Sequence, residues 1–365
     1  MGLNSESVLD RAFWRLAEID QPWTLRQAVS RAARLQNDRQ PHVTVETVFT
    51  EDEHPFDLLT DAVTYGVPRW SGFGIDLLRF ADDDGSWTLA AIGTPEPGVF
   101  HLVGGIPISH RRWNKVERWI GSTHGISRCF LNHSDFEDVG NRLSSRGDVE
   151  VGRWTARLVH DRSSLSRGFP VVTGMARPSH LEAIQEAESQ VASVRTLTMH
   201  VGEVLSLHLR RIAGATFYSG DFKVFEDDVL ARLEVAAASR RTLVTGRARV
   251  EKQAMRPLSI RLEQPVLVTA EDTGSVIEQI ESTSGVSLAV FHRNPYLHVA
   301  VTDEVDGSNF DIMVTDAQTI DVFPGFRASP SALSRISQGL GERFNALDIV
   351  DRTSDPVSLA SLFGG

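Results

Sequence analysis

Residues 75–103 read IDLLRFADDDGSWTLAAIGTPEPGVFHLV and contain three apolar runs separated by two stretches of turn-forming residues. Runs rich in branched and aromatic residues, bounded by Asp, Gly and Pro, are typical of short β-strands. We therefore expect a meander of three strands in this part of the chain. The expected strands are 75–80, 87–92 and 99–103, and the expected turns are 82–85 and 94–98.

On both sides of this meander, the apolar pattern predicts helices as well as strands. Apolar residues repeat at helical spacing over 5–35, where Thr24 is placed to cap the second of two helices. After the meander, helices and strands alternate. A meander that leads into alternating elements predicts mixed, mostly antiparallel sheets covered by helices, which is an α+β fold. The alternating elements are a helix at 109–120, a strand at 126–131, a helix at 134–144 and a strand at 149–159.

The second half of the chain has the same mixture of elements, and a length of 365 residues allows two domains. Strands are expected at 197–212, 215–225, 258–262, 266–269, 286–292, 297–303, 310–315 and 320–323, with helices at 179–193, 227–238, 271–282 and 331–344. A segment rich in Ser, Arg, Gly and Pro marks the expected domain boundary. We expect a helical N-terminal segment at 1–40, α+β domains at 41–165 and 179–350 with a linker at 166–178 between them, and a frayed tail at 351–365.

Composition describes an ordinary globular chain and excludes several classes of protein. Cys129 is the single cysteine, which excludes an intrachain disulfide and a cysteine-based zinc cluster. No window approaches the roughly 18 apolar residues of a membrane span, and the acidic Glu6 does not fit a secretory signal. We therefore expect a cytoplasmic protein that does not associate with membranes.

Charge is distributed unevenly along this chain of net charge −11, and one long segment is basic. Residues 206–262 carry eleven Lys and Arg against six acids. Such a segment suits docking to an anionic partner such as nucleic acid, although it suits self-assembly equally well. The predicted nucleic-acid-binding residues in this segment are Arg240, Arg241, Arg247, Arg249, Lys252 and Arg256.

A second basic feature is the expected helix around residues 110–119. Trp113 and Val116 share one face of this helix, which leaves Arg111, Arg112 and Lys115 facing outward. Outward cations beside aromatic rings can hold a phosphate backbone and stack on bases. The alternative is an amphipathic helix that packs its Trp residues on the sheet and leaves a solvated basic back.

One pattern favours an enzyme instead. Asp221 and Lys223 lie two residues apart on an expected strand, so that both side chains would share one face. Metal-dependent nucleases of the restriction type use such an Asp-x-Lys pair, and Glu203 is a candidate for the further carboxylate that completes the metal site. The non-catalytic interpretation of the same residues is a pair of charges on a solvent-facing hairpin.

The chain contains no P-loop, no Gly-x-Gly-x-x-Gly sequence and no nucleophile elbow, and we expect neither a cofactor nor a bound metal. The sequence therefore predicts a non-enzymatic subunit or adaptor of a nucleic-acid-linked assembly, with its basic surface around residues 206–262. We also expect a protein partner or a homo-oligomer. The competing hypotheses are the divalent-metal nuclease and a purely structural homo-oligomer.

Overall fold

The computed structural model describes residues 7–19, 21–37, 39–51, 69–82, 85–123, 125–158, 171–189, 192–212, 214–247, 256–293 and 296–352. Backbone contacts divide the chain into two compact units. The first unit takes in the described residues up to 157 together with 171–242, and the second takes in Leu158 and those from 243 onward. Both units combine helices with antiparallel strands, so the predicted α+β class is confirmed.

The first unit is built on an eleven-stranded sheet with β1 near its centre. Along the sheet the order is β2-β3-β4-β5-β1-β11-β10-β9-β7-β8, and β6 pairs with the end of β1. The predicted meander is present, because β3, β4 and β5 pair in sequence order. The strands are β1 (Val43–Thr50), β2 (Arg69–Gly72), β3 (Ile75–Asp82), β4 (Gly85–Gly93), β5 (Val99–Gly104), β6 (Ile126–Arg128), β7 (Val149–Leu158), β8 (Val171–Gly174), β9 (Ala192–Val201), β10 (Leu205–Arg210) and β11 (Gly214–Gly220).

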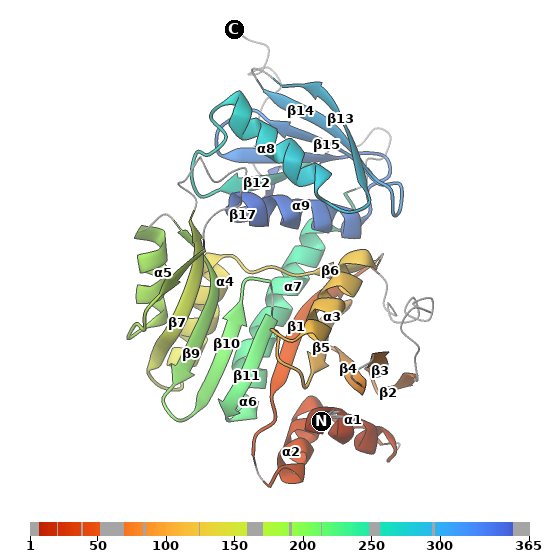
Figure 1. The fold of residues 1–365 in the computed structure, drawn as a ribbon, viewed down its shortest axis with the longest axis vertical. Coiled ribbons are helices and arrows are strands. Elements are labelled where there is room, and N and C mark those ends of the chain that lie inside the picture. Colours follow the sequence, from red (N-terminus) through yellow and green to blue (C-terminus); the bar gives the residue numbers. More distant parts are fainter. Residues whose placement is uncertain are drawn as a thin grey trace. The chain divides into compact units, whose positions relative to one another are not determined.

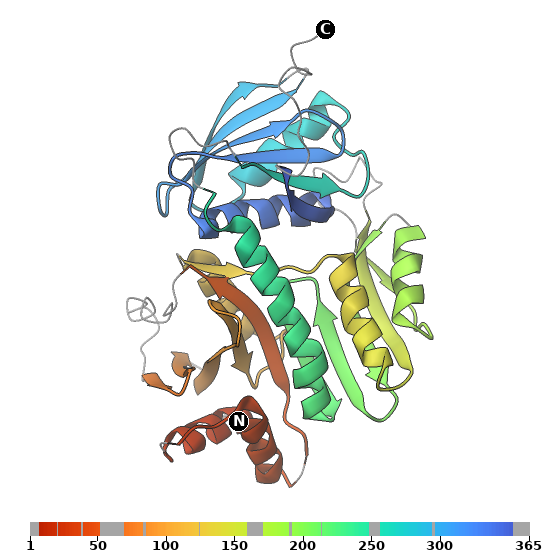
Figure 2. The same ribbon diagram turned by 180° about the vertical axis from the view of Figure 1, so that it is seen from behind.

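Helices cover different faces of the two halves of this sheet. In Figure 1, α3 lies on the near side of the strands, where its Trp113 and Trp119 join a core with the β3–β5 meander. Figure 2 shows α4 and the long α7 on the opposite side. The helices are α1 (Val8–Ala17), α2 (Leu25–Leu35), α3 (Arg111–Ser122), α4 (His133–Ser144), α5 (His180–Ser189), α6 (Phe222–Val224), a π-helical turn (Phe225–Leu230) and α7 (Ala231–Val244).

The N-terminal helices form a pair with well-defined starts. At the start of α1, Ser7 and Asp10 bond each other's backbone N–H groups, and Thr24 and Gln27 do the same at the start of α2. Such capping boxes satisfy donors that a helix end would otherwise leave unpaired. The prediction that Thr24 caps the second helix is confirmed. The pair is attached to β4, because Trp14 Nε1 donates a hydrogen bond to Thr88 Oγ1 at 2.8 Å.

The second unit has a six-stranded antiparallel sheet in the order β13-β14-β15-β16-β12-β17. Two helices, α8 (Ala270–Glu281) and α9 (Pro330–Phe344), pack on it. Both helices were predicted, but β17 was not, and residues 266–269 are not the expected strand. The strands are β12 (Leu258–Leu262), β13 (Val286–His292), β14 (Leu297–Asp303), β15 (Asn309–Val314), β16 (Thr319–Pro324) and β17 (Ala346–Asp351).

Two predicted strands differ from the structure in ways that matter for the site. The expected strand 197–212 is two strands, because a turn at 202–204 folds β10 back on β9. The expected strand 215–225 ends at Gly220, where a φ of +110° turns the chain. Residues 171–174, inside the predicted linker, pair with β7 as strand β8. The division of the chain into the predicted domains stays a prediction.

Candidate functional site

Arg240 and Arg241, the first two cations of the predicted basic surface, lie on α7 and bond within the first unit. The Arg240 guanidinium lies 2.8 Å from Asp135 and 5.3 Å from the ring centre of Phe130. Arg241 Nε donates a hydrogen bond to the carbonyl oxygen of Thr50 at 2.9 Å. Both side chains therefore already hold parts of the fold together.

Arg247 and Arg256 belong to the second unit, where they share one carboxylate. Arg247 is buried and donates to the carbonyl oxygens of Leu243 and Arg256 as well as to Asp351 at 2.9 Å. Burial lowers the pKa of Arg247, although its ion pair with Asp351 opposes this effect. Arg256 also lies 3.0 Å from Asp351, with half of its side chain exposed. Arg249 and Lys252 lie outside the described residues.

On α3, the prediction of outward cations is wrong for one of three residues. Arg111 is exposed and Lys115 is partly exposed, but Arg112 is only 4% exposed. The reason is helical spacing, because Arg112 lies four residues before the buried Val116 and seven before the buried Trp119. Arg112 therefore lies on the face that packs against the sheet.

The three residues of the nuclease hypothesis do not share a strand. Asp221 is the N-cap of α6, and its carboxylate accepts the backbone N–H of Lys223 at 2.8 Å. Glu203 lies in the turn between β9 and β10. The expected strand geometry of Asp221 and Lys223 is wrong, because Gly220 turns the chain before them. Among the described residues, no group of three or more His, Cys, Asp or Glu could hold a metal ion.

A larger polar surface lies on the four adjacent strands β7, β9, β10 and β11. Their apolar residues face α4, the π-helical turn and α7, whereas no described helix of the first unit lies on their opposite side, which faces the viewer in Figure 1. Side chains alternate between the faces of a strand, so every second residue contributes to this open side. We call it the polar sheet face, and its residues are Arg153, Thr155, Thr196, Thr198, His200, Ser206, His208, Arg210, Thr216 and Tyr218.

Hydrogen bonds between neighbouring strands order the side chains of the polar sheet face. Thr198 Oγ1 and His208 Nδ1 are 2.9 Å apart, and the same kind of bond joins His200 and Ser206 at 3.0 Å. On the β7 side, the hydroxyls of Thr155 and Thr196 are 2.7 Å apart. These bonds fix the positions of hydroxyl and imidazole groups on three adjacent strands, so the surface is organised before any ligand arrives.

The inner end of the polar sheet face is a buried group of charges beside α3. Glu46 on β1 is fully buried, and the Nε of Arg128 lies 2.6 Å from its carboxylate. Arg128 also reaches Glu117 of α3 at 3.3 Å. Arg210 extends over Gly214, where any side chain would overlap its guanidinium, and donates to the carbonyl oxygen of Val45 at 3.2 Å. Desolvation lowers the pKa of Arg210 to about 10, which leaves it positively charged at neutral pH.

On β7, β9, β10 and β11 themselves, the polar sheet face has more cations than carboxylates, while Glu46 and Glu117 border its inner end. Arg153 is exposed, and together with Arg210 it lies close enough to His208 to lower its pKa. Among the described side chains on this side of the four strands, Glu150 at the start of β7 is the single carboxylate. Tyr218 is 43% exposed at the other end, where its ring lies 6.0 Å from that of His42. The arrangement can bind an anion and can present flat rings to it.

His208 should make the stability of the first unit depend on pH. Its burial, followed by the charges of Arg210 and Arg153, lowers its pKa from 6.5 to about 4. The unfolded chain therefore binds more protons than the folded chain between pH 6.5 and pH 4. The free energy of unfolding of the first unit is therefore undiminished by His208 above pH 6.5. It falls as the pH is lowered through this interval, by about 3 kcal/mol in total.

We expect His208→Gln to remove this part of the pH dependence. Urea unfolding of both proteins at several pH values between 7 and 4 measures it, followed by tryptophan fluorescence. All seven tryptophans belong to the first unit, so the signal reports that unit alone. Equal slopes of unfolding free energy against pH for the two proteins would contradict the assignment to His208.

The polar sheet face was not predicted, although the sequence contains a signal for it. Residues 197–201 and 205–209 each alternate between apolar and polar side chains, which predicts strands with one buried and one open face. The polar positions of that alternation hold Thr198, His200, Ser206 and His208 and no acid. An alternating segment whose polar positions contain no Asp or Glu is therefore the sequence signal for this face.

In comparisons with known proteins, no family model and no curated protein matches the chain. None of the helices in the described part of the chain is long and apolar enough to span a membrane.

Proposed function

We propose that the protein binds single-stranded nucleic acid on the polar sheet face, as a non-enzymatic subunit of a nucleic-acid-linked assembly. The observation that carries this proposal is the open, positively charged side of β7, β9, β10 and β11. Neighbouring strands lie about 4.8 Å apart, so four strands span about 14 Å. That width accommodates an extended strand of a few nucleotides.

The side chains of the face suit the two parts of a nucleotide. Arg153 at the surface can contact phosphate groups, and the charge of the deeper Arg210 adds to the attraction. Exposed rings, those of Tyr218 and His200, offer surfaces on which bases stack. Hydroxyl and imidazole groups between them can bond base edges. Duplexes hide the stacking faces and the Watson–Crick edges of their bases, so single strands are the favoured form.

Binding of fluorescently labelled 12-nucleotide RNA and DNA, single- and double-stranded, tests the proposal by anisotropy across a salt series. We expect affinity for single strands that falls as salt rises. Tyr218→Ala is expected to weaken binding by about tenfold, because one base loses its stacking partner. Arg153→Gln should weaken binding and lower the salt slope.

The matched control is Arg232→Gln, which removes an exposed cation of α7. Its affinity should equal that of the wild type. Absence of binding at low salt, or an equal loss in Arg232→Gln and Arg153→Gln, would contradict the proposal. Cleavage of the oligonucleotides that needs a divalent metal and is lost in Lys223→Gln would favour the nuclease hypothesis instead.

A further inference from the structure

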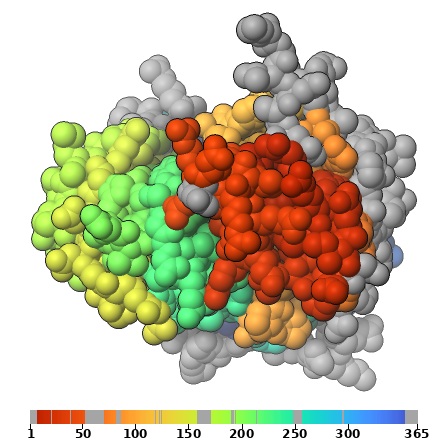
Figure 3. Space-filling view, turned by 90° about the horizontal axis from the view of Figure 1, so that it is seen from below, coloured from red at the N-terminus to blue at the C-terminus, as the bar shows by residue number. Residues whose placement is uncertain are grey.

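A second candidate binding site lies on the N-terminal helical pair. Figure 3 shows these helices, in red, as a broad exposed surface of the first unit. A hollow of about 440 Å³ opens between the end of α1, the connecting segment and α2. This volume falls in the range of small-molecule sites, which is about 300–1,000 Å³.

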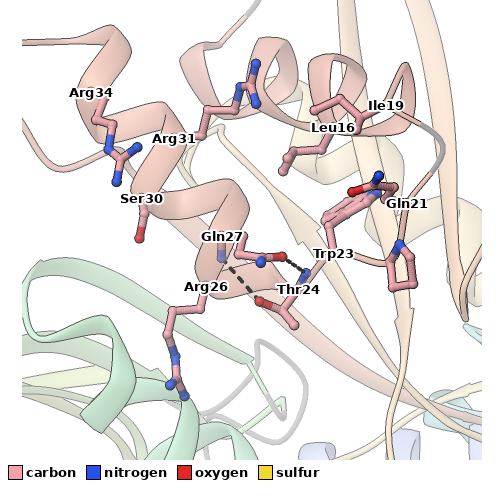
Figure 4. Close-up of a pocket in the computed structure, with 11 residues that line it drawn as sticks. Leu16, Ile19, Gln21, Trp23, Thr24, Arg26, Gln27, Ser30, Arg31 and Arg34 are labelled. Atoms are coloured by element: carbon pink, nitrogen blue, oxygen red, sulfur yellow. Dashed lines mark hydrogen bonds between the residues drawn. The ribbon is translucent and has the colours of Figure 1, made fainter.

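One wall of the hollow is apolar and firmly held. Leu16 lies in the last turn of α1, Ile19 follows that helix, and Trp23 comes from the segment that precedes α2 (Figure 4). The Trp23 ring lies 5.9 Å from that of Phe13 and stacks on Trp70 at 6.2 Å. Aromatic contacts on both sides fix the position of this indole, so the wall exists without a ligand.

The other wall is cationic. Arg31 and Arg34 of α2 line the hollow with Ser30 and Gln27, and none of the lining residues is acidic. Neither guanidinium has an ion-pair partner within the described part of the chain. Arg26 differs, because it pairs with Glu226 at 2.5 Å and Asp227 at 3.2 Å. Two cations therefore remain available beside an apolar wall.

We propose that this hollow binds a small organic anion, in which a phosphate or carboxylate group is attached to an aromatic or aliphatic body. The anionic group would accept hydrogen bonds from the guanidinium of Arg31 or Arg34, since guanidinium groups bind such anions with paired, charge-assisted bonds. The body would lie against Leu16, Ile19 and Trp23, where its contact with water is reduced. This site is separate from the polar sheet face and does not depend on nucleic-acid binding.

Calorimetric titration of the full chain with phenyl phosphate, benzoate, inorganic phosphate and phenol tests the proposal. Phenyl phosphate or benzoate should bind at least tenfold more tightly than inorganic phosphate, and phenol should not bind. Arg31→Gln and Arg34→Gln together should weaken the aromatic anion at least tenfold. Arg11→Gln and Arg15→Gln together are the control, since both side chains are exposed on α1 and neither lines the hollow.

Three results would overturn the proposal. The first is no binding of either aromatic anion at millimolar concentration. The second is equal weakening in the two double variants, which would indicate general attraction by the helical pair. The third is equal affinity for inorganic phosphate, which would leave the apolar wall without a role. Circular dichroism spectra like that of the wild type would show that both double variants are folded.

Discussion

Arg128→Met is expected to lower the free energy of unfolding of the first unit by about 3–5 kcal/mol. The substitution removes the guanidinium that lies 2.6 Å from Glu46, whose side chain is fully buried. Without this partner, the buried carboxylate has lost its hydration and has no ion pair with Arg128 to compensate for that loss. Arg210 stays near, but its guanidinium already bonds the Val45 carbonyl oxygen.

Removing both charges should restore most of the lost stability. In the double variant Glu46→Met with Arg128→Met, the ion pair is removed as a whole, and apolar replacements of buried ion pairs are often neutral or stabilising. Arg210 then loses the attraction of Glu46 but keeps that of Glu117, so we expect most rather than all of the stability to return. Urea unfolding followed by tryptophan fluorescence measures all three proteins. A double variant as unstable as Arg128→Met would show that the loss comes from packing rather than from the charge of Glu46.

Arg142→Met is the matched control for this prediction. Asp228 is also fully buried, with Arg142 at 2.8 Å and Arg146 at 2.7 Å from its two carboxylate oxygens. After the substitution, Arg146 still neutralises Asp228, so we expect a loss below about 1 kcal/mol. A loss of stability as large as that in Arg128→Met would contradict the expectation that Arg146 alone can neutralise Asp228.

The second large effect is expected at Gly220, where an alanine should cost about 2–4 kcal/mol. Its φ of +110° is a conformation that residues with a side chain rarely adopt. An added Cβ would also overlap the carbonyl oxygen of Val204, which accepts the N–H of Asp221 at 2.7 Å. Gln40 further fixes this position, because its side-chain amide bonds both the N–H and the carbonyl oxygen of Gly220 at 2.6 Å.

Gly121→Ala provides the comparison. Gly121 lies in α3, with ordinary helical geometry and nothing within 4 Å of an added Cβ. Alanine there should raise stability by up to about 1 kcal/mol, because glycine is the poorer helix former. Chemical unfolding of the two variants should therefore give opposite signs. Destabilisation of equal size in both would contradict the special role of the turn at Gly220.

Local patterns in the sequence determined most of the secondary structure. Turn residues between apolar runs located β3, β4 and β5, and the cap at Thr24 located the start of α2. The clearest failures occurred where a glycine or a turn interrupted a good alternation, at 202–204 and at Gly220. Single residues with unusual backbone geometry leave hydrophobic periodicity unchanged, so periodicity alone does not reveal them.

The candidate site depended on contacts between distant parts of the chain. The sequence determined that residues 206–262 are basic, but the tertiary structure decided that Arg240 pairs with Asp135 and that Arg247 pairs with Asp351. Sequence likewise determined that β9 and β10 each have a polar side. Only packing decided that α4 and α7 cover the apolar side while α3 covers the other half of the sheet. The physical reason is that periodicity is encoded over a few neighbouring residues, whereas charge pairing and burial arise between segments about a hundred residues apart.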